Sequence, residues 1–198
     1  QKEARQRAGL ITDKQLILFV SQRVTDKRKG IDFLIEAVGK LIEARPELKD
    51  HLGVAILGGH SEAITDNLPL PVYSLGYISD EKRLVDIYNS ANVFVLPSLE
   101  DNLPNTIMES MACGVPCVGF RVGGIPEMID HKMNGYVAEF KDASDFAAGL
   151  FWVLHEADHD ELRRNAVQKV QSKYSQTYVS QRYIEVYNQA LAIKEFHL

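Results

Sequence analysis

The sequence has 198 residues, of which 45% are hydrophobic, 25% charged and 9% aromatic. This balance is typical of a folded globular chain with a sizeable core, and it excludes a disordered chain. The formal net charge of −5 excludes the general excess of positive charge that favours binding to nucleic acid. A phosphate group would therefore have to be bound by a local site.

The apolar runs of the sequence are short. Runs such as Leu16 to Val20 and Val93 to Leu96 are far shorter than the roughly 20 residues of a membrane-spanning helix. The start, QKEARQRAG, is charged and lacks the apolar stretch of a signal peptide, so we expect residues 1–15 to be a polar lead-in. Two cysteines, Cys113 and Cys117, are too few for a disulfide framework or a complete zinc site. These features favour a cytoplasmic protein.

Strands and helices alternate from the start of the first apolar run. Leu16 to Ser21 is typical of a strand that is covered on both faces. A basic loop ends at Gly30, and apolar residues at intervals of three and four then predict a helix from Ile31 that stops near Pro46. Further strands are predicted at Val54–Leu57, Val72–Leu75, Val93–Leu96, Pro116–Phe120 and Gly135–Val137, and helices at Asp80–Ser90 with Ser79 as N-cap, around Asn105–Ala112, and after Gly124. This order predicts an α/β fold with a doubly wound parallel sheet.

The pattern changes after Phe140. Residues 142–154, 161–174 and 178–192 have helical periodicity, and no strand intervenes. The sequence shows no internal repeat, low-complexity tract or linker. We therefore predict one domain over residues 16–198, of which about residues 142–198 form a helical appendage.

The loops that follow the strands are the candidate sites, because ligands of open parallel sheets bind beyond the carboxyl ends of the strands. The first of these loops is Gln22 to Gly30, QRVTDKRKG. It contains four basic residues, Arg23, Lys27, Arg28 and Lys29. In a chain that is acidic overall, they indicate a local anion site; a solvated, charge-rich turn is the alternative.

The loop after the fourth strand carries acids. Glu100, Asp101 and Asn102 precede the predicted helix, while Glu109 lies on the same helix face as Asn105. Carboxylates in the loop and on the helix could thus contact different parts of one extended ligand. The helix start also offers N–H groups that suit a phosphate or a sugar hydroxyl. The alternative is that the loop acids only favour the helix dipole and that Glu109 is a surface residue.

The residues around Glu109 argue against that alternative. Ile107, Met108 and Met111 make this helix largely part of the core. A lone carboxylate there would be costly without a partner.

Two glycine pairs, Gly58-Gly59 and Gly123-Gly124, follow predicted strands and could bring backbone amides close to a ligand. A tight turn between strand and helix is the alternative reason for each pair. Neither pair forms a P-loop or a G-x-G-x-x-G fingerprint, because no G-K-[ST] follows and the glycine spacing differs.

Two other classes of protein are alternatives. His155 to His159 (HEADH) match the H-E-x-x-H pattern of zinc hydrolases, in which both histidines lie on one helix face. The match lies where one predicted helix ends and the next begins, so we do not expect a shared face. A non-enzymatic flavodoxin-like or receiver-like module would need an acidic cluster or a flavin loop after its first strand, and the basic loop argues against it.

Nearly the whole chain from about Leu16 onward resembles the C-terminal, donor-binding half of a retaining GT-B glycosyltransferase of the family 4 type. The resemblance is carried by the basic loop ending in Lys29-Gly30, Gly58-Gly59, Leu75-Gly76-Tyr77, Pro97-Ser98 with its acids, Ala112-Cys113-Gly114-Val115-Pro116, Gly123-Gly124 and Asn134-Gly135. In that family two acids follow an E-x7-E pattern. The residue eight positions before Glu109 is Asp101, so the first acid is shortened to aspartate.

The resemblance implies transfer of a hexosyl unit from a UDP- or GDP-sugar to a glycan or lipid-linked acceptor, as in polysaccharide biosynthesis. It implies that Arg23 and Lys29 bind the donor diphosphate and that Lys29 and Asp101 are the catalytic residues. Asp101 would lie near the donor sugar, and Glu109 would accept hydrogen bonds from the ribose. Contact with the base would come from the turn after Gly76.

The resemblance also implies further donor-binding residues. These are Gly59 after the second strand, Tyr77 and Ile78 beside the base, and Asn102, Leu103, Pro104, Asn105 and Thr106 around sugar and phosphate. The family often has Gly-Phe-Gly-Leu where this chain has residues 102–105, and Pro104 has no N–H to donate. Asn102, Asn105 or Thr106 are candidates to replace the missing contacts.

The resemblance implies no metal and no cofactor beyond the donor substrate. The acceptor site of the family belongs to an N-terminal Rossmann-like domain, which we expect to be absent from these 198 residues. Any peripheral contact with a membrane would then be made through that missing half. No nucleic acid partner is expected.

Overall fold

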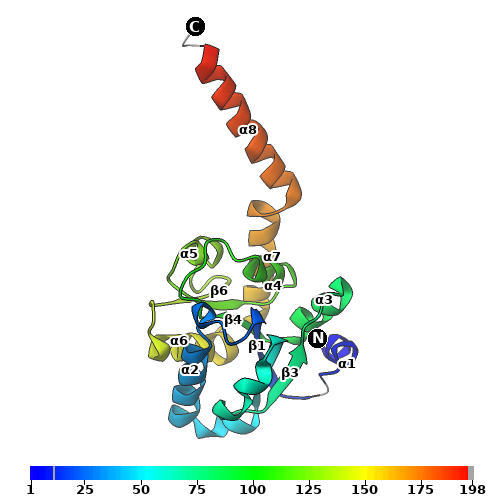
Figure 1. Cartoon of the computed structure of the whole chain (residues 1–198), viewed down its shortest axis with the longest axis vertical. Helices are drawn as coiled ribbons and strands as arrows, with labels where there is room; N and C mark the ends of the chain where they lie inside the picture. The colour runs from blue at the N-terminus through cyan, green and yellow to red at the C-terminus, as the bar shows by residue number, and fades with distance from the viewer. Residues whose placement is uncertain (11, 196–198) are drawn as a thin grey trace.

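The computed structural model describes residues 1–10 and 12–195 and has a parallel sheet between two layers of helices (Figure 1). The six strands are β1 (Gln15–Arg23), β2 (Leu52–Gly59), β3 (Val72–Gly76), β4 (Val93–Leu96), β5 (Cys117–Phe120) and β6 (Gly135–Ala138). Their order across the sheet is β3-β2-β1-β4-β5-β6, and every neighbouring pair is parallel. The predicted doubly wound parallel sheet is confirmed.

The strand order reverses at the centre of the sheet. From β1 the chain moves outward through β2 to β3, and then returns to place β4 on the other side of β1. The segments after β1 and β4 therefore lead to helices on opposite faces of the sheet. Such a reversal point is where open α/β sheets bind their ligands.

One face of the sheet is covered by α2 (Ile31–Ala44) and α6 (Ala143–Phe151), which also pack against each other. The apolar positions of α2 recur on one face, so its buried side chains are Ile31, Leu34, Ala37, Val38, Leu41 and Ile42. Phe120 of β5 joins the layers, because its ring makes edge contacts with Phe33 at 5.5 Å and with Phe146 at 5.0 Å.

The other face carries α1 (Lys2–Ala8), α3 (Glu81–Ser90), α4 (Asn105–Ala112) and the short α5 (Ile125–Met128). Their apolar residues pack on the opposite side chains of the same strands, among them Leu18 and Phe94. Short 3-10 segments, η1 (Lys27–Lys29), η2 (Pro46–Asp50), η3 (Ser61–Ala63) and η4 (Thr65–Asn67), connect the elements. Both faces of the sheet are therefore dry, which is why its strands are nearly continuous apolar runs.

Part of the predicted polar lead-in forms a helix, and one predicted helix cap differs from the structure. Helix α1 buries Ala4 and Ala8, and its Arg7 forms an ion pair with Asp86 at 2.8 Å. Ser79 is not the N-cap of α3. Asp80 caps it instead, since its carboxylate accepts a hydrogen bond of 2.8 Å from the backbone N–H of Arg83.

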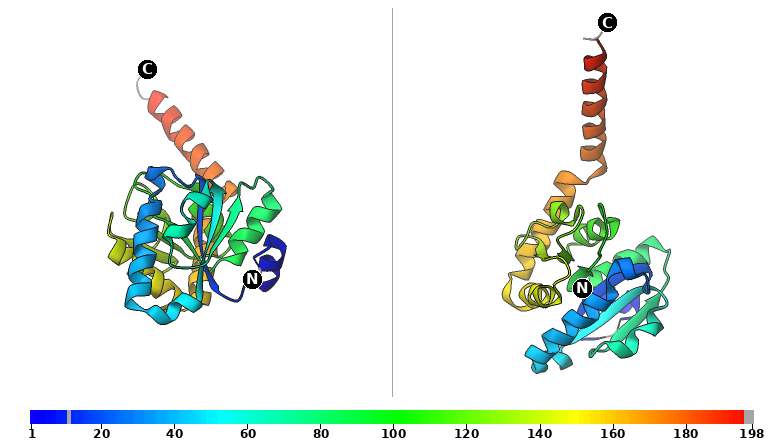
Figure 2. Two further views of the ribbon diagram at one scale, coloured as in Figure 1. Left: turned by 60° about the horizontal axis from the view of Figure 1, so that its bottom comes forward. Right: turned by 60° about the vertical axis from the view of Figure 1, so that its left-hand side comes forward.

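The carboxyl-terminal helices do not behave as one unit. The predicted helix over residues 142–154 is α6 followed by a π-helical turn, η5 (Trp152–Glu156), and α6 is part of the layer beside α2. Helix α7 (His159–Lys173) packs against α4. Only α8 (Gln176–Glu195) extends away from the body (Figure 2). Over residues 1–10 and 12–195, no helix combines the length and apolar character needed to cross a membrane.

Candidate functional site

Part of the positive charge of the basic loop after β1 is neutralised by an acid of the same loop. Asp26 begins η1 and accepts a hydrogen bond of 3.0 Å from the backbone N–H of Arg28. The Arg28 guanidinium returns to the same carboxylate, with Nη2 2.9 Å from Oδ2. These hydrogen bonds lower the pKa of Asp26. Arg28 is thus paired within the loop, whereas Lys27 is exposed to solvent.

Lys29 points across the reversal point of the sheet. Its Nζ atom lies 2.9 Å from Oδ2 of Asp101, a residue 72 positions later in the chain. The Lys29 side chain is 32% exposed and that of Asp101 is 15% exposed, so the pair is sheltered but can be reached from solvent. The neighbouring acid, Glu100, is exposed. The structure therefore brings together the two residues that the family resemblance assigns to catalysis.

Close backbone contact sets the position of this pair. Gly30 follows Lys29 with φ of 69°, and a Cβ atom there would collide with the carbonyl oxygen of Pro97 after β4. The backbone N–H of Leu99 donates to the carbonyl oxygen of Arg28 at 2.8 Å. The loops after β1 and β4 are thus joined along their backbones, and glycine at position 30 is required for the approach.

The second glycine pair supports the acid loop from the other side. Gly123 has φ of 53°, and a Cβ atom there would collide with the carbonyl oxygen of Asp101. The N–H of Gly124 donates to the carbonyl oxygen of Asn102 at 2.6 Å. The expectation that this amide faces a ligand is therefore wrong for Gly124, because its hydrogen bond holds the acid loop instead.

The two residues of the first glycine pair, Gly58 and Gly59, have different roles. A Cβ atom at Gly58 would collide with the carbonyl oxygen of Ser21, so this glycine allows close contact between β2 and β1. Gly59 lies opposite Arg23 in the strand register, and its carbonyl oxygen accepts a hydrogen bond of 3.0 Å from Val24. Arg23 itself is exposed at the end of β1. Gly59 and Arg23, predicted separately, are therefore neighbours.

The residues expected to contact the base follow the edge strand β3. Tyr77 is 74% exposed, whereas Ile78 is half-buried and packs against the apolar layer below α3. Strand β3 is separated from β1 by β2. Tyr77 and Ile78 therefore lie along the carboxyl edge, two strands from Lys29.

The remaining predicted residues form the segment from the acid loop into α4. Asn102, Leu103 and Asn105 are exposed, Thr106 is half-buried and Pro104 is buried at the start of the helix. Ser98, just before the acids, is fully buried, and its hydroxyl has no hydrogen-bond partner within the part of the chain that the structure describes.

Glu109 is an exposed residue on α4, so the argument against a surface position for it is wrong. Its carboxylate nevertheless has a partner, because Oε2 accepts a hydrogen bond of 2.7 Å from the hydroxyl of Tyr88 on α3. Burial, and next the hydrogen bond to Glu109, raise the pKa of Tyr88, so the phenol stays protonated and remains a donor. The sequence analysis did not identify Tyr88. The signal that could have indicated it is general: the hydroxyl of a buried tyrosine needs a polar partner.

The H-E-x-x-H match does not form a zinc site. His155 lies in η5 and stacks on Phe151, with ring centroids 5.2 Å apart. His159 begins α7, and its Nε2 atom lies 2.8 Å from the carbonyl oxygen of Asn92. The two imidazoles thus belong to different helices, contrary to the zinc hydrolase alternative. Across residues 1–10 and 12–195, no group of three or more His, Cys, Asp or Glu side chains is arranged to hold a metal.

The chain is similar to known glycosyltransferase sequences. Residues 14–156 match the family described as "Glycosyl transferases group 1". The chain is 32% identical over 165 residues to a D-inositol 3-phosphate glycosyltransferase of Thermobifida fusca, covering 78% of this chain and 38% of that protein. It is 32% identical over 190 residues to an uncharacterized glycosyltransferase of Methanocaldococcus jannaschii, covering 94% and 48%. The chain thus spans half or less of the length of these relatives.

Solved structures show the same fold. Sucrose-phosphate synthase of Thermosynechococcus elongatus superimposes with a TM-score of 0.79 at 24% identity, over 98% of this chain and 49% of that one. HepE of Anabaena, in complex with UDP-glucose, superimposes with a TM-score of 0.76 at 18% identity, over 95% and 52%. The sheet and its helices form the Rossmann-like half of a GT-B fold. The chain therefore belongs to the group 1 family of glycosyl transferases.

Proposed function

We propose that this chain is the donor-binding half of a retaining glycosyltransferase, which transfers a hexosyl unit from a UDP- or GDP-sugar to a glycan or lipid-linked acceptor. The observation that carries the proposal is the contact of 2.9 Å between Lys29 and Asp101 at the reversal point of the sheet. A cation and an acid at this point match the two groups of the donor that change during transfer, its diphosphate and its sugar.

Lys29 is the residue that stabilises the leaving group. Its ammonium is held by a single carboxylate in a sheltered position. A diphosphate carries more negative charge than Asp101 and can replace it as the partner of Lys29, forming charge-assisted hydrogen bonds. Negative charge grows on the diphosphate as the bond to the sugar breaks, so a fixed cation there lowers the barrier. Arg23, which is exposed at the end of β1, supplies a second positive charge.

Asp101 changes partner in the same step. When the diphosphate takes Lys29, the Asp101 carboxylate is released beside the donor sugar. It then stabilises positive charge that develops on the sugar as the leaving group departs. The acceptor hydroxyl attacks from the face that the diphosphate leaves, which retains the configuration, and its proton passes to the departing diphosphate.

The remaining contacts orient the nucleotide. Glu109 accepts hydrogen bonds from the ribose hydroxyls, and Tyr77 and Ile78 contact the base. Gly59 and residues 102–106 line the path of sugar and phosphate. The structural relative HepE, described as a complex with UDP-glucose, supports a uridine nucleotide as donor. The acceptor binds a second domain outside this chain. The complete enzyme acts in the cytoplasm in polysaccharide biosynthesis, and it needs no metal or other cofactor.

A thermal-shift screen of this chain against UDP, GDP, ADP and their sugars tests the proposal. A ligand that binds only the folded state raises the melting temperature, by an amount that grows with its concentration. We expect UDP or GDP to raise it and uridine or guanosine to have little effect. If no nucleoside diphosphate raises the melting temperature at millimolar concentration, the proposal is wrong.

A turnover assay tests the assignment of this chain as half of an enzyme. With a UDP-sugar and an acceptor present, we expect the purified chain to bind the donor but to release no UDP, because the acceptor domain is missing. Sustained release of UDP by the chain alone would overturn this assignment.

A further inference from the structure

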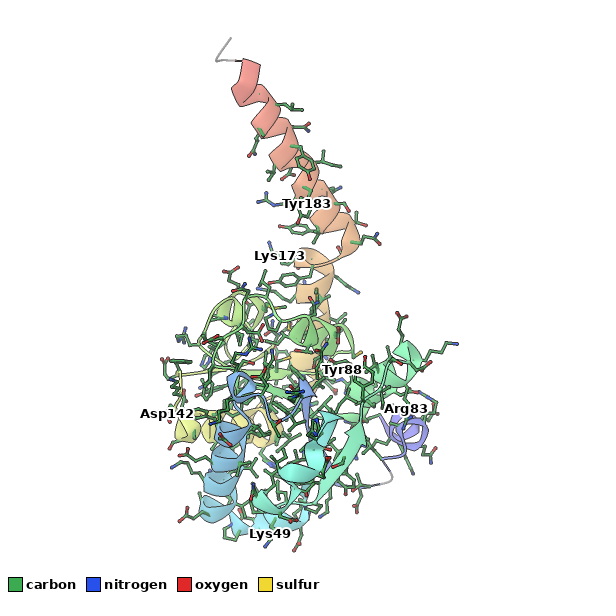
Figure 3. All side chains as sticks on the ribbon, in the orientation of Figure 1. Lys49, Arg83, Tyr88, Asp142, Lys173 and Tyr183 are labelled. Atoms are coloured by element: carbon green, nitrogen blue, oxygen red, sulfur yellow. The ribbon has the colours of Figure 1, made fainter. Side chains whose placement is uncertain are left out.

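Tyr88 is a buried phenol whose only polar atom faces the candidate site. The residue lies on α3 (Figure 3). It is 3% exposed. Its ring makes an edge contact with Phe94 of β4, with ring centroids 6.1 Å apart, inside the apolar layer between the helices and the sheet. The ring is therefore fixed by packing on its apolar sides, and the hydroxyl can reach only what lies above it.

The hydroxyl reaches one oxygen of Glu109. The distance from the Tyr88 hydroxyl to Oε2 is 2.7 Å, which is typical of a hydrogen bond from a hydroxyl to a carboxylate. Glu109 is an exposed residue on α4, and a free glutamate there would sample several rotamers. The hydrogen bond to the fixed Tyr88 hydroxyl removes this freedom. The position of the carboxylate then depends on α3 as well as on α4.

The bond leaves Glu109 able to accept more. A carboxylate has about four lone-pair positions on its two oxygens, and Tyr88 uses one of them. Oε1 and the free side of Oε2 remain for ligand hydroxyls. Because the partner is neutral, it does not cancel the negative charge of Glu109, in contrast to the ion pair at Asp101.

We propose that Tyr88 is a positioning residue, which holds the Glu109 carboxylate in the orientation that accepts the ribose hydroxyls and so sets the preference for ribonucleotides over deoxyribonucleotides. The inference rests on the proposed contact between Glu109 and the ribose. A ligand that lacks these hydroxyls gains nothing from an oriented carboxylate. Tyr88 therefore acts on the ratio of two affinities rather than on binding in general.

The test is calorimetric titration of this chain with UDP and with 2′,3′-dideoxy-UDP. We expect the chain to bind UDP at least about tenfold more tightly, the amount that one charged hydrogen bond provides. In Tyr88→Phe, which keeps the ring and removes the hydroxyl, this ratio should fall to about threefold, with the affinity for dideoxy-UDP unchanged. Replacement by 4-aminophenylalanine, which restores a donor, should recover most of the ratio.

Tyr136→Phe is the matched control. The Tyr136 hydroxyl also donates to a carboxylate, Oδ1 of Asp145, at 2.8 Å, but on β6 at the far edge of the sheet. Its removal should leave the ratio of the two affinities unchanged. Should Tyr88→Phe fail to fold, as judged by its melting curve, 4-fluorophenylalanine at position 88 carries a substituent close to a hydroxyl in size that cannot donate, and makes the same test.

The possible failures are distinct. An unchanged ratio in Tyr88→Phe, or an equal loss of affinity for both nucleotides, overturns the positioning role and leaves the proposed function intact. If the unmodified chain binds both nucleotides equally well, the contact between Glu109 and ribose is wrong, and the inference falls with it. If it binds neither nucleotide, the proposed function fails first.

Discussion

Asp101 and Glu109 are eight residues apart in the sequence, yet their side chains have different kinds of partner. Asp101 lies in the loop after β4 and is paired with a cation, the ammonium of Lys29. Glu109 lies on α4 and is paired with a neutral phenol, Tyr88. An ionic partner can be taken over by an incoming anion, whereas the Tyr88 hydroxyl leaves lone pairs of Glu109 free for donors on a ligand. Under the proposed function, the first carboxylate is released when the donor binds and the second is held in place.

The support beneath the two acids differs as well. Asp101 depends on backbone contacts between loops, with Gly30 on one side and Gly123 on the other. Glu109 depends on a regular helix and on side-chain packing below it. Substitutions can therefore disturb one acid without moving the other.

Gly123→Ala is expected to have the largest effect. The new Cβ atom would collide with the carbonyl oxygen of Asp101 and would force alanine into a left-handed conformation. We expect the free energy of unfolding to fall by roughly 2–4 kcal/mol, as measured by urea denaturation, with UDP binding weakened through the displaced loop.

Gly39→Ala provides the control for this change. Gly39 lies inside α2, and a Cβ atom there meets nothing within 4 Å. Alanine should stabilise the chain by about 0.5–1 kcal/mol. If both variants have the stability of the unmodified chain, the acid loop is not held by its contact with Gly123.

Lys29→Ala tests the ion pair between Lys29 and Asp101. We expect UDP binding to weaken by roughly 1.5–3 kcal/mol, because a charge-assisted contact to phosphate is lost, while uridine binding hardly changes. Calorimetric titration with both ligands measures the difference. Lys27→Ala, in the same loop but exposed, should change neither affinity strongly. Equal losses for UDP and uridine would mean that Lys29 does not contact the phosphates.

Asp101→Ala should separate turnover from affinity in the complete enzyme. We expect kcat to fall about tenfold or more, which corresponds to roughly 1.4 kcal/mol of transition-state stabilisation. The affinity for UDP should stay the same or rise slightly, since Lys29 loses its competing partner. Glu100→Ala, one residue earlier and exposed, is the control. A silent Asp101→Ala together with a loss of kcat in Glu100→Ala would show that the assignment is wrong by one position.

Glu109→Ala should show the complementary, smaller effect. A ribose contact exists in both the ground state and the transition state, so we expect a donor KM raised about tenfold and a nearly unchanged kcat. Binding of UDP to this chain should weaken by the same factor. Glu127→Ala, an exposed acid on α5, should leave both quantities unchanged. A loss of kcat without a change in KM would place Glu109 at the sugar instead.

Much of the fold could be predicted from local sequence patterns. The strand at Val93–Leu96 and the helix at Asn105–Ala112 have the predicted bounds, because their apolar residues and turn signals lie within the segments themselves. Where the local signal was ambiguous, the prediction was less accurate. Both Ser79 and Asp80 can cap a helix, and the capping contact belongs to Asp80.

The sequence by itself determined the parallel α/β architecture, the loops that form the candidate site and the resemblance to glycosyltransferases. Only the tertiary structure decided which acid faces Lys29, that Tyr88 is the partner of Glu109, and that the Gly124 N–H is used within the protein. The physical reason is distance along the chain. Periodicity reports which side of an element is buried, but the contact between Lys29 and Asp101 joins residues 72 positions apart and depends on the pairing of β4 with β1.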